Sequence, residues 1–200
     1  ILDCLLAFAH VAHEKGYVRP TFNNQGRIYL KNSRHPVVEQ NLRVHPFVPN
    51  DIFLDNQAVN FILITGPNMA GKSTYMRQIA ILVMLAQSGS FIPAEVADMC
   101  LVDKLFTRIG ANDNLFEGKS TFMVEMLESA NILHNATSKS LIIMDEIGRG
   151  TSTFDGLSIA AAIAKYIYNT IKAKTLFETH YHEMTTLTST HPLMKNANVA

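Results

Sequence analysis

The feature that most constrains the fold is an apolar run that passes directly into a glycine-rich loop and then into a helical stretch. The run is FILIT at 61–65, the loop is GPNMAGKST at 66–74, and the helical stretch is YMRQIAILVMLAQ at 75–87. Such an unbroken apolar run is typical of a strand buried in a parallel sheet. Similar runs recur in LIIMDE at 141–146 and TLFET at 175–179, with a helical pattern between them at 157–171. This alternation predicts an α/β fold in which a layered sheet is flanked by helices.

The flanking segments give weaker signals. Residues 1–15 place apolar side chains at helical spacing and end at Gly16, a typical helix stop. YVRPTF and GRIYLK, separated by a turn-rich stretch at 23–26, predict a β-hairpin. RHPVVEQ at 34–40 and HPFVPND at 45–51 are predicted to be loops because they carry three prolines between them.

Composition excludes several classes of protein. The chain has 200 residues, of which 48% are hydrophobic, and this suits a packed globular domain. Lys+Arg and Asp+Glu are 17 each, so no global basic field predicts nucleic-acid binding by these residues alone. Two cysteines are too few for a disulfide scaffold, and no apolar run reaches transmembrane length. Because the chain starts at Ile1 within a helical pattern, we expect a segment of a longer protein.

The loop at 66–73 fits the phosphate-binding pattern G-x-x-x-x-G-K-S between a strand and a helix. Its backbone N–H groups and the following helix N-terminus would face one anion. Lys72 would reach the β- and γ-phosphates, and the Ser73 hydroxyl would bind Mg²⁺. A glycine-rich turn with an exposed lysine is the structural alternative. The predicted nucleotide-binding residues are Gly66, Pro67, Asn68, Met69, Ala70, Gly71, Lys72, Ser73 and Thr74.

The letters GKST occur a second time at 118–121. This copy lacks the first glycine of the pattern, because Asp113 stands five residues before Gly118, and Glu117 adds a second acid. It precedes a predicted helix, FMVEMLESANILHN at 122–135. Two interpretations remain open from the residues alone: Ser120 contacts a phosphate presented from outside, or Ser120 or Thr121 simply caps the helix.

Two carboxylates, Asp145 and Glu146, end the apolar run at 141–144. The carboxyl end of a parallel strand faces the crevice where such sheets bind ligands. Asp145 would hold Mg²⁺, and Glu146 would orient and polarise the attacking water as the catalytic base. His180, directly after the run at 175–179, could hydrogen-bond a γ-phosphate.

The motifs TGPNMAGKSTYMRQIA, STFMVEM, MDEIGRGTSTFDG and THYHE, in this order and spacing, resemble the ATPase domain of the MutS family of DNA mismatch-repair proteins. YVRP, RHPVVE and FVPND resemble the same family, so the likeness covers essentially the whole chain. It implies a P-loop, ABC-ATPase-like fold. It also implies that residues 1–16 end the family's helical core and lever region and that residues 17–200 form a C-terminally truncated ATPase domain.

The resemblance further implies a Mg²⁺-dependent ATPase that binds ATP or ADP in a composite dimeric site. Ser120 would reach the γ-phosphate bound by a second MutS-type subunit, and Phe47 would stack on adenine. His180 would sense the γ-phosphate and count among the catalytic residues. Asn68 and residues 148–153 would lie at the nucleotide and dimer interface. Glu178 departs from the family, which usually has a small residue there; it could act on His180 or point away.

Two functions therefore follow. The first is ATP hydrolysis that drives a DNA clamp recognising mispaired DNA. Mismatched DNA and a MutL-type protein would be partners of the full-length parent. The protein would act inside the cell, near the nucleoid in a bacterium. The alternative is a nucleotide-gated dimerisation module of a recombination or structural relative, in which hydrolysis is incidental. The intact Asp145-Glu146 pair favours the enzyme.

Overall fold

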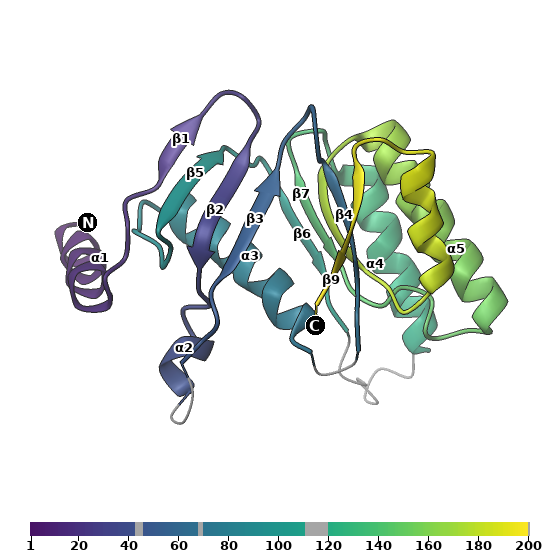
Figure 1. The fold of residues 1–200 in the computed structure, drawn as a ribbon, viewed down its shortest axis with the longest axis horizontal. Coiled ribbons are helices and arrows are strands. Elements are labelled where there is room, and N and C mark those ends of the chain that lie inside the picture. The colour runs from purple at the N-terminus through teal and green to yellow at the C-terminus, as the bar shows by residue number, and fades with distance from the viewer. Residues whose placement is uncertain (43–45, 68–69, 111–119, 200) are drawn as a thin grey trace. The chain divides into compact units, whose positions relative to one another are not determined.

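The computed structural model describes residues 1–42, 46–67, 70–110 and 120–199. The described chain divides into two compact units, the first formed by residues 1–56 and 74–101 and the second by residues 57–73 and 102–200. Each unit contains one sheet (Figure 1). The α/β architecture predicted from the alternating strands and helices is confirmed.

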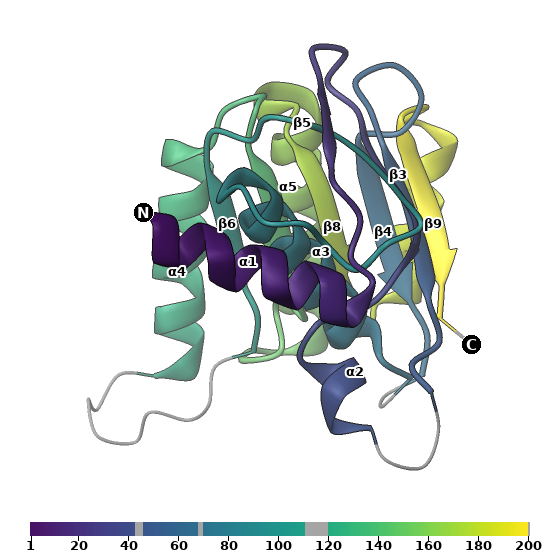
Figure 2. The same ribbon diagram turned by 90° about the vertical axis from the view of Figure 1, so that its left-hand side faces the viewer.

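The first unit contains a four-stranded sheet in the order β1-β5-β2-β3. Its elements are α1 (Leu2–Lys15), β1 (Thr21–Asn23), β2 (Ile28–Ser33), α2 (Val38–Asn41), β3 (Asn50–Leu54), most of α3 (Lys72–Gln87) and β5 (Val96–Cys100). The helix predicted at 1–15 is present, and Gly16 follows it in a left-handed conformation. Figure 2 shows α1 at the front. Residues of α1, among them Leu5, Phe8 and Ala12, line a groove together with Tyr17 and Phe91. Leu2, Leu5 and Leu6 of α1 are exposed.

The predicted β-hairpin at 17–31 is wrong, because β5 lies between β1 and β2. β1 pairs with β5 in parallel, and β2 pairs with β5 in an antiparallel manner. The turn itself forms: Asn23 donates to the Arg27 carbonyl (3.0 Å) and accepts the Gln25 N–H (3.0 Å). Asp98 of β5 then accepts hydrogen bonds from Asn23 (2.9 Å) and Arg27. A distant strand therefore supplies the pairing that the local pattern assigned to a hairpin.

The predicted loops are also wrong in part. Residues 34–40 include the start of the short helix α2, and residues 45–51 run into β3. β3 pairs with β2, and its side chains alternate between exposed and buried positions. The alternation in Asn50–Leu54 was the available signal, and the nearby prolines obscured it.

The second unit contains a five-stranded parallel sheet in the order β6-β7-β8-β4-β9. Its elements are β4 (Phe61–Thr65), the first two residues of α3, β6 (Leu105–Arg108), α4 (Thr121–Asn135), β7 (Leu141–Met144), α5 (Thr153–Tyr166), a π-helical turn (Ile167–Ile171), β8 (Lys174–Glu178), a 3₁₀ segment (His182–Ser189) and β9 (Met194–Asn198). The strands predicted at 61–65, 141–146 and 175–179 are confirmed as β4, β7 and β8, although β7 ends at Met144, before the two acids. β5, β6 and β9 were not predicted.

Alternate residues of the central strands form the core against α4 and α5, which cover one face of the parallel sheet (Figure 1). Phe61 of β4 stacks on Phe177 of β8, with 5.9 Å between ring centroids. Ala160 and Ala164 of α5 are fully buried in the same cluster, and their small side chains allow the helix to approach the strands. This packing fixes the positions of the strand ends that carry the polar motifs.

Candidate active site

The strand order brings three of the predicted motifs to one edge of the parallel sheet. β8 lies between β7 and β4. Asp145 follows β7, Glu178 is the last residue of β8, and the loop at 66–71 follows β4. Because parallel strands end at the same edge, Glu178 lies between the two segments that the sequence singled out.

Lys72, the first residue of α3, is folded back onto its own loop. Its Nζ donates hydrogen bonds to the carbonyls of Gly66 (2.8 Å) and Pro67 (2.9 Å). The residue is 6% exposed, so this is not a turn with a solvated lysine. Asn68 and Met69, predicted to contact nucleotide, lie outside the described residues.

Gly66 takes a backbone conformation that favours glycine. Its φ is +139°, and a Cβ added there would lie 2.6 Å from the Val199 carbonyl oxygen. The chain must therefore turn at this residue without a side chain. The close approach explains why the pattern begins with glycine directly after a buried strand.

Glu178 contacts two of the residues predicted to bind nucleotide and metal. Its Oε1 lies 3.3 Å from Lys72 Nζ, and its Oε2 accepts a hydrogen bond from Ser73 Oγ (3.2 Å). Burial raises the pKa of Glu178, and the neighbouring Asp145 carboxylate raises it further, whereas Lys72 opposes the shift. The Glu178 carboxylate is therefore directed at the phosphate loop, whereas the sequence left open an effect on His180.

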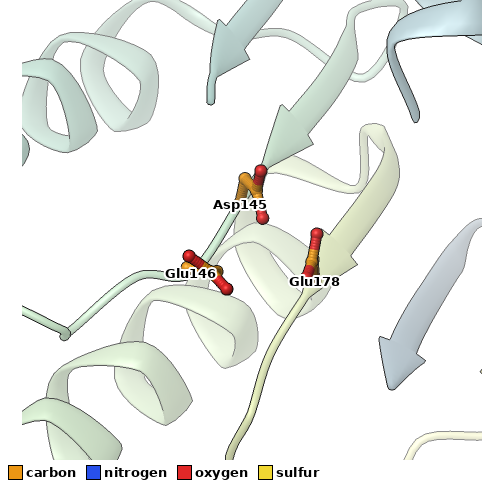
Figure 3. A group of neighbouring side chains, drawn as sticks. All are labelled: Asp145, Glu146 and Glu178. Atoms are coloured by element: carbon orange, nitrogen blue, oxygen red, sulfur yellow. The ribbon is translucent and has the colours of Figure 1, made fainter. Parts of the chain in front are cut away.

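Asp145 and Glu146 lie beside Glu178 and differ in environment (Figure 3). Asp145 is buried, and its N–H donates to the Arg108 carbonyl (2.7 Å). Glu146 is partly exposed, has a φ of +53°, and pairs its carboxylate with Arg149. A left-handed conformation is uncommon for a residue with a Cβ and costs about 1–2 kcal/mol. The sharp turn directs the two neighbouring carboxylates differently.

Hard oxygen donors suitable for Mg²⁺ gather at this edge. One carboxylate oxygen from each of Asp145, Glu146 and Glu178 lies within 4.8 Å of the others. Among the described residues, the buried Asp145 Oδ1 has no hydrogen-bond partner. An acceptor in this state is normally satisfied by a donor, water or ion. Asp145, together with the Ser73 hydroxyl, therefore fits a small divalent cation.

His180 lies at the surface just past β8. Its ring centroid is 3.9 Å from that of Tyr181. Partial burial lowers the pKa of His180, Arg149 lowers it further, and Glu146 and Glu183 oppose the shift. The imidazole is therefore neutral at neutral pH and offers one donor and one acceptor.

Ser120 occupies the N-cap position of α4, but its side chain makes no capping hydrogen bond within the described part of the chain. The corresponding residue of α5, Ser152, does accept a hydrogen bond from the Asp155 N–H (3.3 Å). The simple side-chain capping role considered for Ser120 is therefore not seen. Gly118 and Lys119, also in the second GKST, lie outside the described residues.

Phe47, predicted to stack on adenine, belongs to the first unit. It follows α2 and precedes β3 in the sequence, and its side chain is half-buried. The phosphate loop belongs to the second unit. Stacking of Phe47 on adenine stays a prediction.

A buried network supports the segment after Glu146, and the sequence analysis missed it. Gly148 donates its N–H to Glu125 Oε1 (2.6 Å) and accepts a hydrogen bond from the Tyr181 hydroxyl (3.1 Å). Glu125 is 4% exposed, and Arg108 lies 3.7 Å from its second carboxylate oxygen. An acid on the buried face of the helix at 122–135 was the signal that could have revealed it.

A cleft of about 220 Å³ lies along this network. It is lined by Arg108, Gly110, Thr121, Glu125, Asp145, Glu146, Arg149 and Gly150. The start of α4 and the two strand-end acids thus border one polar cleft within the second unit. Water or a small anion could approach Glu146 from this side.

A parallel sheet with an inner strand, β4, that passes through a glycine-rich loop into a helix defines a P-loop NTPase-like α/β domain. The profile described as MutS domain V matches residues 62–200. Proteins named DNA mismatch repair protein MutS match the full chain: 56% identity over 200 residues in Syntrophomonas wolfei, and 58% over 199 residues in Carboxydothermus hydrogenoformans. The chain belongs to the MutS domain V family.

The matched relatives are much longer than this chain. The chain spans 23% of the Syntrophomonas wolfei protein and 24% of the Carboxydothermus hydrogenoformans protein. A Dehalococcoides mccartyi protein with the same name is 56% identical over 201 residues, and 23% of its length is covered. The resemblance inferred from the motifs is confirmed at the level of the family.

The Glu125 network predicts a large loss of stability on truncation. Glu125→Ala should lower the free energy of unfolding by about 3 kcal/mol, because it leaves the Gly148 N–H unpaired and removes a buried partner of Arg108. Glu128→Ala is the matched control, since Glu128 also lies beside Arg108 (2.8 Å) but is half exposed, and it should cost about 1 kcal/mol or less. Urea unfolding of both variants checks this. Equal losses would contradict the assigned role of Glu125.

Proposed function

We propose that this chain is the ATP-binding and ATP-hydrolysing domain of a MutS-type DNA mismatch-repair protein. The observation that carries the proposal is the meeting of Lys72, Ser73 and Asp145 around one buried carboxylate, that of Glu178. A cation for phosphate and two oxygen donors for Mg²⁺ stand where parallel sheets bind ligands. The names of the relatives support the setting in mismatch repair.

The phosphate loop would bind the triphosphate with its backbone and Lys72. In the structure Lys72 is held by two loop carbonyls and Glu178, so it must exchange at least part of these contacts for phosphate oxygens. The predicted loop contacts, Gly66 to Thr74, and the stacking of Phe47 on adenine belong to this proposal. A bound Mg²⁺, held by Ser73 and Asp145, would neutralise charge on the phosphates.

Glu146 would act on the attacking water. It follows Asp145, the proposed metal ligand, and its carboxylate borders the polar cleft. Its carboxylate is paired with Arg149, which must be released for Glu146 to accept a hydrogen bond from water. The neutral His180 could donate a hydrogen bond to the γ-phosphate and report its loss.

A second subunit would complete the site. Ser120, whose hydroxyl makes no capping bond in the described structure, would contact the γ-phosphate bound by the partner subunit. Residues 148–153 would lie at the same interface. The full-length protein would convert this cycle into clamp movement on mismatched DNA and interaction with a MutL-type protein.

The domain limits are part of the proposal. Residues 1–16 would end a helical core and lever region, and residues 17–200 would form the ATPase domain. The exposed Leu2, Leu5 and Leu6 of α1 support the first assignment, because such a stripe needs an apolar cover.

No helix within the described residues is long and apolar enough to cross a membrane. A role in DNA repair implies action inside the cell, beside the nucleoid in bacteria such as those of the relatives.

The roles of Lys72 and Glu146 predict that one variant loses ATP binding and the other loses only ATP hydrolysis. Lys72→Ala should abolish ATP binding, because the loop loses its mobile cation. Glu146→Gln should retain binding and lose hydrolysis, because the phosphate and metal contacts survive. Titration with a fluorescent ATP analogue and a phosphate-release assay separate the two. Hydrolysis by Glu146→Gln at the parent rate would show that Glu146 is not the base.

The role of Phe47 predicts a loss that is independent of the γ-phosphate. Phe47→Ala should weaken ATP and ADP binding alike, by about 1–3 kcal/mol, the scale of aromatic–base stacking. Phe53→Ala offers a control, since Phe53 is an exposed aromatic residue on β3 of the same unit. Calorimetric titration with both nucleotides measures the effect. Unchanged affinity in Phe47→Ala would remove this residue from the site.

A composite site predicts rescue by mixing two inactive variants. Ser120→Ala and Glu146→Gln chains should each hydrolyse ATP poorly. In a mixed pair, one site takes Glu146 from the first chain and Ser120 from the second, so some activity should return. Activity of the parent should also rise faster than linearly with protein concentration. Linear dependence without rescue would show that Ser120 does not act in trans.

A further inference from the structure

Glu178 has two carboxylate oxygens with different surroundings. Oε1 faces Lys72 Nζ at 3.3 Å, so one oxygen is balanced by a cation. Oε2 accepts a hydrogen bond from Ser73 Oγ at 3.2 Å, and the Glu178 carboxyl group also lies within hydrogen-bond distance of the Asp145 carboxyl group. Figure 3 shows Glu178 and Asp145 at the ends of neighbouring strands, with their carboxylates turned toward a shared space. Two acidic groups therefore approach each other closely here, and a positive charge between them would satisfy both.

The charges in this cluster do not balance. Asp145, Glu178 and Lys72 are 5%, 2% and 6% exposed, respectively. Two buried carboxylates thus share one buried ammonium group, while the third carboxylate, Glu146, is paired with Arg149. Buried charges are normally paired, because desolvation is costly. One negative charge is therefore left for a cation or a proton to neutralise.

A second observation points to a cation. Asp145 Oδ1 is buried and has no hydrogen-bond partner within the described residues. The 3.2 Å between Ser73 Oγ and Glu178 Oε2 is close to the roughly 2.9 Å that separates neighbouring ligands around Mg²⁺ bonded at about 2.0–2.1 Å. Carboxylate and hydroxyl oxygens are ligands that suit Mg²⁺ and Mn²⁺.

We infer that Glu178 is an additional carboxylate ligand that lets this chain hold a hard divalent cation together with Asp145 and Ser73 before any nucleotide binds. The inference extends the proposed function, since Asp145 and Ser73 are the residues assigned there to the Mg²⁺ of Mg-ATP. A small residue at position 178, which the resemblance leads one to expect, would leave a single carboxylate and Ser73. Here the nucleotide would meet a loop already supplied with its metal.

Mn²⁺ binding to the nucleotide-free chain tests this inference. The paramagnetic resonance of free Mn²⁺ reports the bound fraction during titration of the 200-residue chain. We expect one Mn²⁺ per chain without nucleotide. Glu178→Gln, which keeps size and shape, and Glu178→Ala should each weaken binding at least about tenfold, since even loss of groups that only orient a metal ligand costs roughly 10–100-fold. Glu183→Gln is the matched control, an exposed acid just beyond the same strand, and should bind like the parent.

The same titration with ATP present separates this inference from the proposed function. If Mn²⁺ binds only once ATP is added, or binds equally well to Glu178→Gln, the inference is wrong and the ATP site stands. If Mn²⁺ binds through Glu178 but the chain fails to bind ATP, the inference stands and the proposed function fails. Circular dichroism shows whether each variant is folded. If Glu178→Ala is unfolded, the comparison uses Glu178→Gln alone.

Discussion

The buried contact between Lys72 and Glu178 organises the carboxyl edge of the parallel sheet. It joins the last residue of β8 to the first residue of α3, and the same lysine binds two carbonyls of the loop between β4 and α3. A lysine in this position cannot stay uncompensated, because removing its charge from water is costly. The conformation of the loop therefore depends on the neighbouring strand as well as on its own glycines.

Such a contact is a poor source of stability, and this bears on its function. The attraction within a buried ion pair is largely cancelled by desolvation of the two charges. The stability of the second unit comes instead from apolar packing, in which Phe61, Phe177 and Ala160 are fully buried. The packed apolar core of the second unit thus holds the charged residues at the strand ends in place. Its contacts can be exchanged for those of a ligand without loss of the fold.

The sequence predicted the parts of this site better than their arrangement. The runs at 61–65, 141–146 and 175–179 were predicted as strands because buried parallel strands are mostly apolar along their length. The order of these strands is a long-range property that no local pattern contains. Glu178 was therefore noticed only as an unusual residue near His180, whereas the order β7-β8-β4 turns it toward Lys72.

The hairpin failed for the same physical reason. Asn23 forms the turn that its sequence predicts, but Asp98, far along the chain, binds both sides of that turn and keeps β1 and β2 apart. Glu125 was missed because helical periodicity predicts the burial of apolar residues only. The burial of an acid depends on its partners, here Gly148 and Arg108, which only the tertiary structure brings together. Local signals therefore identified elements and motifs, while tertiary contacts decided the pairings.

The N-cap residues of α5 and α4 are both serines, Ser152 and Ser120, but their surroundings differ. Ser152 is followed three residues later by Asp155; the Asp155 N–H donates to Ser152 Oγ, and Ser152 Oγ donates to the Asp155 carboxylate at the start of α5. Ser120 is followed three residues later by Met123, and the first turn of α4 contains no acid. The positive end of α5 is thus neutralised by its own sequence, whereas that of α4 has no acid within its first turn. In the proposed composite site, the phosphate of a nucleotide held by a second subunit would supply the negative charge that the first turn of α4 lacks.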